Sequence, residues 1–524
     1  MSNLSAPPRL ASAAAVFLGR HGEVTRLAHD RGVFRQTLYR EAHAVARALD
    51  SDRGAAPRED LCQRLAQARA EADRLRRRLR HAVALGGDRL AEFAATAQAL
   101  GVSLSAARAL LGVLLGKAAP SVARLGRLSQ EAGRRASAAL AVLDAYSRPR
   151  ARQVAADELF SGRRPVLMTV EQDSLCWLGG RLAQSREGPQ WRREFEQLPA
   201  AEQVTRDGGL GMQKGLQLAN AGRRKAGLAE VADQEDHFHI LHRGRRGLRE
   251  VRHKAARALR LAEEAQAKLR RDRRKGKVPG CGSRAAAVNR LWRRAEQAFD
   301  RWSAHERALE RLRAGLRLFT PEGRLNTPGR AEAEVKAALA ALDGPEWSRL
   351  RTRLVGPKAF TFLARAHEQL GALPVPAGLR AAAVRAEGLR HQPEALRGET
   401  EAAGALRGVL LACGLVLALS GEAGARARAL VRGVLGGAWR SSSLVEGLNS
   451  VLRMQQRRQK RLTQGLLDLK RLHWNTHVFV AGKRRKQTPY GRLGLVLPEG
   501  TWWQLLQMTP EQLRDQLSEL NPAA

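Results

Sequence analysis

The spacing of hydrophobic residues divides the chain into long helical stretches and one shorter stretch rich in strands. Residues 14–49 have apolar side chains at helical spacing, with the rhythm of a helix-turn-helix. Residues 61–85 keep helical spacing without a helix breaker, which predicts one long helix or a short coiled coil, acting as a dimer contact or a linker. A second helix-turn-helix-like pattern follows at 90–115.

In the first helix pair, Ala28 is small where two helices would cross, and Gly32 stands where the turn needs a permissive backbone. Val33 and Leu38 are expected to pack inward. The residues left on the exposed recognition helix are Arg35, Gln36, Thr37, Tyr39 and Arg40. The pattern favours DNA binding, and an ordinary corner of two packed helices is the alternative.

The second helix pair repeats these features. Ala97 and Gly101 have the same spacing, and Ser103 or Ser105 is placed to cap the second helix. Two such modules in tandem suit the recognition of an extended DNA end.

The sequence pattern changes near Arg148, where short β-prone runs alternate with turns. VAADELF, PVLMTVE and LCWLGG predict an antiparallel meander. An amphipathic helix, a short strand ending at Asp207 and a Gly-rich turn into another helix come next. DHFHILH, from Asp236, is expected to be a further short strand.

From Gly244 to about Gly436 the chain is expected to be almost entirely helical and basic. Its most apolar stretch, GVLLACGLVLALSG from Gly408, is short and interrupted by glycine, so a buried helix is expected rather than a membrane span. Another helix is predicted from Arg440, and a basic loop, a turn and a closing helix end the chain.

Net charge narrows the class of partner. The chain carries 91 Lys and Arg against 51 Asp and Glu, a formal charge of +40. A field of one sign favours a polyanion, and nucleic acid is expected ahead of an acidic membrane surface. Compositional drift toward arginine is the alternative source of the bias.

The cysteines and the N-terminal sequence indicate the cellular compartment in which the protein is expected. Cys62, Cys176, Cys281 and Cys413 lie far apart without a C-x-x-C pair, which fits neither a disulfide framework nor a zinc site. The N-terminus lacks the pattern of a signal peptide. We therefore expect a cytoplasmic protein, associated with the bacterial nucleoid when bound to DNA, with no membrane partner.

Three carboxylates are expected to converge in an α/β core. Asp157 lies within the first β-run, Asp207 ends a short strand, and Glu446 lies in the first turns of a late helix. Acidic residues on central strands and on a following helix suit two-metal phosphoryl transfer, in which shared carboxylates hold two Mg²⁺ ions. The alternative for each residue alone is a solvated surface acid.

Four motifs together resemble a bacterial insertion-sequence transposase of the DDE type, whose catalytic core is ribonuclease-H-like. They are DELFSGRRPVLMTVEQDS, VTRDGGLGMQKGL, DHFHILHRGRR and the long block from Arg440. The last is the most specific, because S-x-x-E-x-x-N-S-x-L-R, then H-x-N, then GKR…TP…LG all occur in it. The resemblance covers roughly 150–245 and 435–495.

The resemblance implies a catalytic and metal-binding triad of Asp157, Asp207 and Glu446, holding two Mg²⁺ ions for which Mn²⁺ can substitute. Glu171 is the alternative to Asp157, because in a meander the two are expected to be neighbours. Further active-site neighbours are His239, Asn449 and Arg453. The implied reaction is nicking of DNA at the element's end, followed by attack of the released 3′-hydroxyl on target DNA. The implied partners are double-stranded DNA and further copies of the chain, as a homodimer or higher multimer.

The expected fold is mixed and predominantly α-helical, with a ribonuclease-H-like core interrupted by a large helical insertion. The expected domains are 1–60, a helix-turn-helix; 61–147, a long helix and a second helix-turn-helix-like module; 148–244, the first part of the core; 245–436, the basic helical insertion; and 437–524, the final core helices and tail. The residues expected to contact DNA are Arg35, Gln36, Thr37, Arg40, Trp439, Arg457, Arg458, Lys460, Arg461, Lys483 and Arg484. A non-catalytic or decayed DNA-binding protein and a ribonuclease-H-like nuclease are the alternatives.

Overall fold

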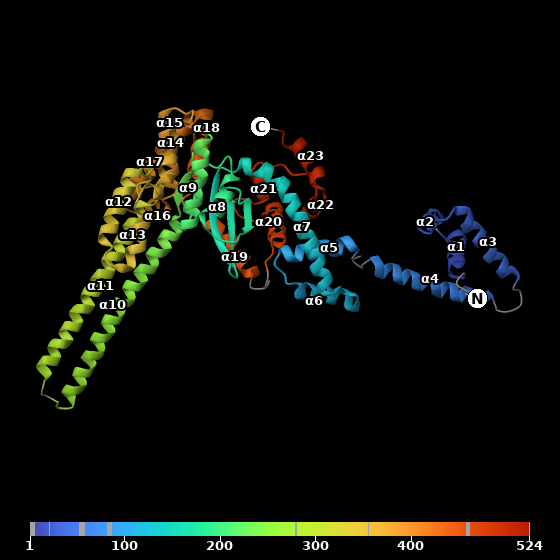
Figure 1. Cartoon of the computed structure of the whole chain (residues 1–524), viewed down its shortest axis with the longest axis horizontal. Coiled ribbons are helices and arrows are strands. Elements are labelled where there is room, and N and C mark those ends of the chain that lie inside the picture. The colour runs from blue at the N-terminus through green and yellow to red at the C-terminus, as the bar shows by residue number, and fades with distance from the viewer. Residues whose placement is uncertain are drawn as a thin grey trace. The chain divides into compact units, whose positions relative to one another are not determined.

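The computed structural model describes residues 6–19, 21–51, 58–80, 86–277, 280–354, 356–456 and 462–522. The chain divides into two compact units, Met1–Gly86 and Gly87–Ala524. Figure 1 shows that helices predominate and that the strands lie together in one region. The predicted class, mixed but mostly helical with a small sheet, is confirmed.

The first unit is helical throughout its described residues. Its elements are α1 (Ala6–Leu18), α2 (Glu23–Asp30), α3 (Arg35–Ser51) and α4 (Arg58–Arg80). Leu38 is buried as predicted, whereas Val33 is only half-buried. Ala28 is buried in α2, and Gly32 has a φ of 61° in the turn between α2 and α3. Arg35, Gln36 and Arg40 are exposed and Thr37 is half-buried. The DNA-binding role of α3 stays a prediction.

The second helix pair belongs to the larger unit. It consists of α5 (Gly87–Ala99) and α6 (Leu104–Leu115), and α7 (Val122–Ser147) follows. Ser103 caps α6 by accepting a hydrogen bond from the backbone of Ala106, and Gly101 has a φ of 80°. The exposed face of α6 carries Leu110, Val113 and Leu114, so this helix presents apolar rather than basic side chains at these positions.

Five strands form one sheet among the described residues, in the order β3-β2-β1-β4-β5. Their bounds are Gln153–Ser161, Arg164–Glu171, Trp177–Leu182, Gln203–Arg206 and Ala232–Glu235 for β1 to β5. β1, β2 and β3 are antiparallel, which confirms the predicted meander, and β4 and β5 continue the sheet in parallel with β1.

Helices cover both faces of this sheet. On one face, Val154 and Ala156 of β1 share a core with side chains of α7, α8 (Gly188–Glu196) and α9 (Leu210–Lys225). On the other face, Ala155 and Leu159 share a core with α19 (Ser443–Gln456). Alternation along β1 therefore turns Asp157 toward the α19 side.

The expectation of a strand at DHFHILH is wrong. The last strand, β5, ends at Glu235, and Asp236 is the N-cap of α10 (His237–Arg274), its side chain accepting a 2.7 Å hydrogen bond from the backbone N–H of Phe238. Aromatic and apolar residues gave the stretch a strand-like composition, but an aspartate that satisfies a free N–H of the first turn starts a helix.

The predicted helical region between the sheet strands and the last motif is confirmed, and it starts at His237 rather than at 245. Its main helices are α10, α11 (Cys281–Gly315), α12 (Pro328–Ala341), α13 (Ser348–Leu354), α14 (Thr361–Gly371), α15 (Ala377–Arg390), α16 (Pro393–Arg397), α17 (Glu401–Leu419) and α18 (Gly421–Gly436). α10 and α11 lie side by side as a long hairpin that extends beyond the shorter helices (Figure 1).

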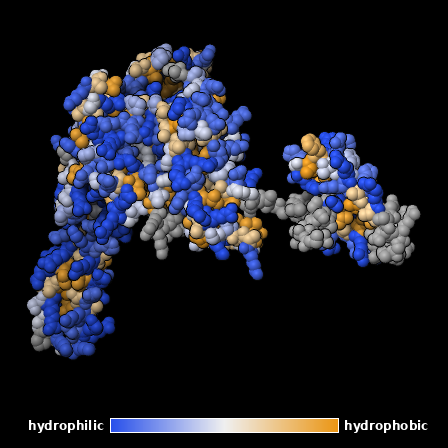
Figure 2. Space-filling view, turned by 45° about the vertical axis from the view of Figure 1, so that its right-hand side comes forward, coloured by the Kyte–Doolittle hydropathy of each residue, from blue (hydrophilic) through white to orange (hydrophobic). Residues whose placement is uncertain are grey.

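The expectation that the apolar stretch from Gly408 is a buried helix is wrong. It lies in α17, where Leu411 is 69% exposed, Leu415 60% and Leu419 87%. Among the described residues, α17 is the one helix that is long and apolar enough to cross a membrane by length and composition. The face of the molecule in Figure 2 is mostly hydrophilic, with hydrophobic patches between the polar areas.

The C-terminal segment completes the larger unit. After α19 it contains α20 (Gln464–Thr476), α21 (Pro489–Arg492), α22 (Trp502–Gln507) and α23 (Pro510–Leu520). α20 crosses α7 where two glycines meet, Gly133 and Gly465. The buried Arg471 of α20 donates a 2.8 Å hydrogen bond to Asp144 of α7. These contacts fix the helices that support the sheet.

Replacing Gly133 by alanine should destabilise the larger unit. The added Cβ would lie 2.9 Å from backbone atoms of Gly465, so α7 and α20 must separate. We expect a loss of about 1–3 kcal/mol in the free energy of unfolding, measured by denaturant or thermal unfolding. Gly112→Ala in α6 is the control, because its Cβ would meet nothing within 4 Å. Equal stability of the two variants would contradict the close helix crossing.

Candidate metal centre

Strand pairing brings the first two predicted ligands together. Ala156 of β1 pairs in parallel with Arg206, the last residue of β4, so Asp157 on β1 and Asp207 directly after β4 are neighbours. Because parallel neighbours at one register stay close, these two side chains need no loop to bring them together. Asp207 itself accepts a 2.8 Å hydrogen bond from the backbone of Gly209, which holds its carboxylate at the start of α9.

The third strand adds a histidine to the pair. Arg206 pairs with Glu235 of β5, so Asp236 follows in the same row and begins α10. One turn into that helix lies His239. Ligand atoms of Asp157, Asp207 and His239 all lie within 4.8 Å of one another. His239 was predicted as a neighbour of the site, and its imidazole lies beside the two aspartates.

Glu446 reaches the same region from α19. Its Oε1 lies 3.5 Å from Nε2 of His239, and its Oε2 lies 3.4 Å from the guanidinium of Arg453. The start of α19 is attached to the start of α10 by two contacts. The Ser442 hydroxyl donates to the carboxylate of Asp236, and the backbone N–H of His237 donates to the carbonyl of Arg440 at 2.9 Å. Glu446 therefore meets the cluster through His239.

Glu171 does not neighbour Asp157, and that expectation is wrong. The register of the β1–β2 pair places Met168 opposite Asp157, and Glu171 opposite Val154. Glu171 instead closes the turn after β2, where its carboxylate accepts hydrogen bonds from the backbone and hydroxyl of Ser174 at 2.7 and 2.5 Å.

Burial sets the electrostatics of Asp157. The pKa of this carboxyl is raised to about 8, chiefly by loss of water and also by the nearby charges of Glu446 and Asp207, although the backbone N–H of Glu158 opposes the shift. The amide of Asn449 donates to the other Asp157 oxygen, so this predicted neighbour holds the carboxyl in place. A divalent cation bound here would stabilise the ionised form of this buried acid, which the charges of the other two acids disfavour.

Several residues around the centre were not predicted from the sequence as parts of the site. Asp236 is buried, and loss of water raises its pKa although its hydrogen bond from Ser442 opposes that rise. Arg206 is buried as well, and it donates to the carbonyl of Asp207 at 3.0 Å and to Asp233 at 2.7 Å. The N-cap pattern could have identified Asp236. No local signal identifies Arg353, which comes from α13 and donates to Glu235 at 2.7 Å.

The residues of the larger unit that were predicted to contact DNA differ in their exposure and in their contacts within the protein. Trp439 is half-buried, and the ammonium of the exposed Lys483 lies 5.1 Å from its ring centroid. Arg484 is 9% exposed and donates to the backbone carbonyls of Asp173 and Gln172, so its guanidinium is used in the fold. The remaining basic residues of the predicted track lie outside the described residues; they are Arg457, Arg458, Lys460 and Arg461.

Comparison with protein-family models, with curated proteins and with solved structures finds no match to this chain. Its function is therefore inferred from the residues of the centre. Two carboxylates and an imidazole, with a third carboxylate in contact, offer mainly oxygen ligands, which suit Mg²⁺ or Mn²⁺.

Removing the charge of Asp157 should stabilise the metal-free chain at pH 8. The folded state holds this proton up to a pKa of about 8, whereas an unfolded aspartate releases it near 3.8. The folded state thus binds more protons between these values, and its stability falls as the pH rises through them. Asp157→Asn removes that fall, so we expect a Tm at least about 2 °C above wild type at pH 8 and little difference at pH 4, with a chelator present.

The exposed Asp515 offers the control, since Asp515→Asn removes the same charge away from the centre. If Asp157→Asn lowers the Tm equally at both pH values, burial does not raise the pKa of this carboxyl, and the prediction is contradicted.

Proposed function

We propose that this chain is a DDE-type transposase with a ribonuclease-H-like core, which cleaves and joins DNA with the help of divalent metal ions. The observation that carries the proposal is the cluster of Asp157, Asp207 and His239 within 4.8 Å, with Glu446 in contact with His239. These side chains come from β1, the end of β4, α10 and α19, which are far apart in sequence. The fold therefore has to bring them together, unlike acids that are neighbours on one surface helix or loop.

The surrounding fold supports the same proposal. The sheet is an antiparallel meander followed by two parallel strands, with Asp157 on the central strand β1 and Asp207 directly after its parallel neighbour β4, as the resemblance implies. The long helical block from α10 to α18 stands between β5 and α19, in the position of an insertion in such a core. The net charge of +40 suits a DNA substrate.

The residues of the centre fit two-metal chemistry. In this proposal Asp157 and Asp207 would hold the metal ions, with His239 or Glu446 as a further ligand. Bound there, divalent ions would supply a nucleophilic hydroxide and stabilise charge on the phosphoryl oxygens. Asn449 orients the carboxyl of Asp157, and Arg206 fixes the backbone of Asp207. His239, between Glu446 and Asp236, can also accept a proton from an attacking water or hydroxyl.

In the proposed reaction, water cleaves one strand at the element's end and leaves a 3′-hydroxyl. That hydroxyl then attacks a phosphodiester of the target, so one P–O bond forms as another breaks. The number of phosphodiester bonds is conserved in the joining step, which needs no ATP. The same side chains serve both steps, because both are in-line displacements at phosphorus.

Asp207→Asn should abolish metal-dependent DNA cleavage. Without this ligand the nicking of supercoiled plasmid in Mg²⁺ or Mn²⁺ should fall at least about 100-fold, measured by gel electrophoresis. Duplex binding, measured by mobility shift, should survive. Glu171→Gln is the matched control, because this acid lies at the turn after β2 and should keep nicking within about threefold of wild type.

The same assay with a linear duplex bearing a free 3′-hydroxyl tests for joining. Metal-dependent joining that Asp207→Asn lacks supports the transposase. Cleavage without joining favours a nuclease, and binding without chemistry favours a non-catalytic DNA-binding protein. Nicking that is unchanged in Asp207→Asn would contradict the proposed centre.

A further inference from the structure

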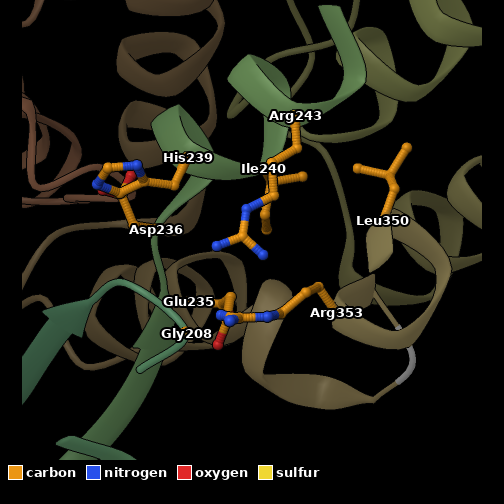
Figure 3. Close-up of a pocket in the computed structure, with 8 residues that line it drawn as sticks. All are labelled: Gly208, Glu235, Asp236, His239, Ile240, Arg243, Leu350 and Arg353. Carbon is orange, nitrogen blue, oxygen red and sulfur yellow. The ribbon is translucent and has the colours of Figure 1, made fainter. Parts of the chain in front are cut away.

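A small hollow adjoins the candidate metal centre, and its charged lining residues are Arg243, Arg353, Glu235 and Asp236 (Figure 3). Its volume is about 10 Å³, and His239 belongs to both the hollow and the metal cluster. Gly208, next to Asp207, forms part of its wall, and Arg243 and Arg353 point into it. A space of this size holds one water-sized atom and excludes a base or a sugar.

Arg243 has donors that the described protein does not use. It lies in the second turn of α10, is half-buried, and has no hydrogen bond or ion pair with another described residue. Burial lowers its pKa, as does the neighbouring charge of Arg353, whereas Asp207 and Glu235 raise it. A guanidinium offers five N–H donors, so a half-buried one without partners is suited to an anionic ligand.

Arg353 has a different position in the same hollow. A Cβ built on Gly208 would lie 0.4 Å from its Nη1, so this guanidinium occupies the space that a side chain there would fill. Its charge is matched by Glu235 at 2.7 Å. Arg353 therefore forms a fixed wall and leaves Arg243 as the group that is open to a ligand.

Charged side chains of both signs line the hollow, because Glu235 and Asp236 belong to it as well as Arg243 and Arg353. Arg206 and Lys358 each contact Asp233 at 2.7 Å, and Arg353 contacts Glu235. Asp233 and Glu235 are thus matched by cations other than Arg243. A guanidinium that has no ion pair among the described residues and lies beside an acidic cluster suits a phosphate that bridges the arginine and the cluster.

We propose that Arg243 binds a non-bridging oxygen of a DNA phosphodiester and thereby positions the backbone beside Asp157 and Asp207. The inference rests on the proposed function and names a contact of that same site. The hollow receives the one oxygen atom, and Arg353 limits its depth. Arg243 is thus a substrate-binding residue contributed by the first turns of the helical insertion.

Duplex binding in Ca²⁺ tests this contact without chemistry. Arg243→Ala should weaken the binding of a 30-base-pair duplex about tenfold, and the slope of log affinity against log salt should fall by about one. Arg243→Lys should recover part of the affinity, because it keeps the charge but loses the fork. Arg514→Ala, which removes an exposed arginine from α23, is the charge-matched control and should stay within about twofold of wild type.

Mn²⁺ titration of the same variants separates binding of DNA from support of the metal centre. Arg243→Ala should bind Mn²⁺ as tightly as wild type or more tightly, because a cation near Asp207 has been removed. Loss of Mn²⁺ binding would make Arg243 a structural support and overturn the inference, as would duplex binding equal to that of Arg514→Ala. Failure of the proposed function has a separate signature, namely wild-type chain that neither binds Mn²⁺ nor nicks DNA.

Discussion

The parallel pairing of β1 with β4 is the constraint on which the candidate centre depends. It places Asp157 and Asp207 side by side, and burial then removes the water that would screen their repulsion. Burying two carboxylates that repel each other costs free energy, so contacts with neighbouring residues must hold these side chains in place. Asn449 supplies a hydrogen bond to one aspartate, and Arg206 fixes the backbone of the other.

The same constraint explains why distant segments meet here. α10 starts from β5 with Asp236 as its cap, and Ser442 binds that cap, so the beginning of α19 is held against the beginning of α10. Val445 and Leu448 then pack on β1, which leaves Glu446 near His239. α13 adds Arg353 from the helical block. That block is therefore built into the wall of the centre.

Much of this could be predicted from the sequence. The meander, the strand before Asp207 and the helical block follow from periodicity and turn residues, and the two aspartates follow from their places at strands. Other features depend on tertiary contacts. The composition of DHFHILH resembles a strand, and only its capping aspartate distinguishes it from one. The register that separates Glu171 from Asp157 is set by pairing across β1 and β2.

The remaining differences have the same origin. The apolar pattern of α17 is that of a buried helix, but neighbouring helices leave Leu411 and Leu415 exposed. Arg353 lies in a stretch without a motif, and its position over Gly208 arises only when the helical block folds against the sheet. Periodicity identifies which faces are apolar, whereas the partner of each face depends on the whole fold.

Anomalous diffraction from crystals soaked in Mn²⁺ tests the central claim most directly. We predict at least one anomalous peak within coordination distance of Asp157 and Asp207, with His239 or Glu446 completing the ligand set, and its loss in Asp207→Asn. No peak at these carboxylates at saturating Mn²⁺, or a peak that persists in the variant, would contradict the account.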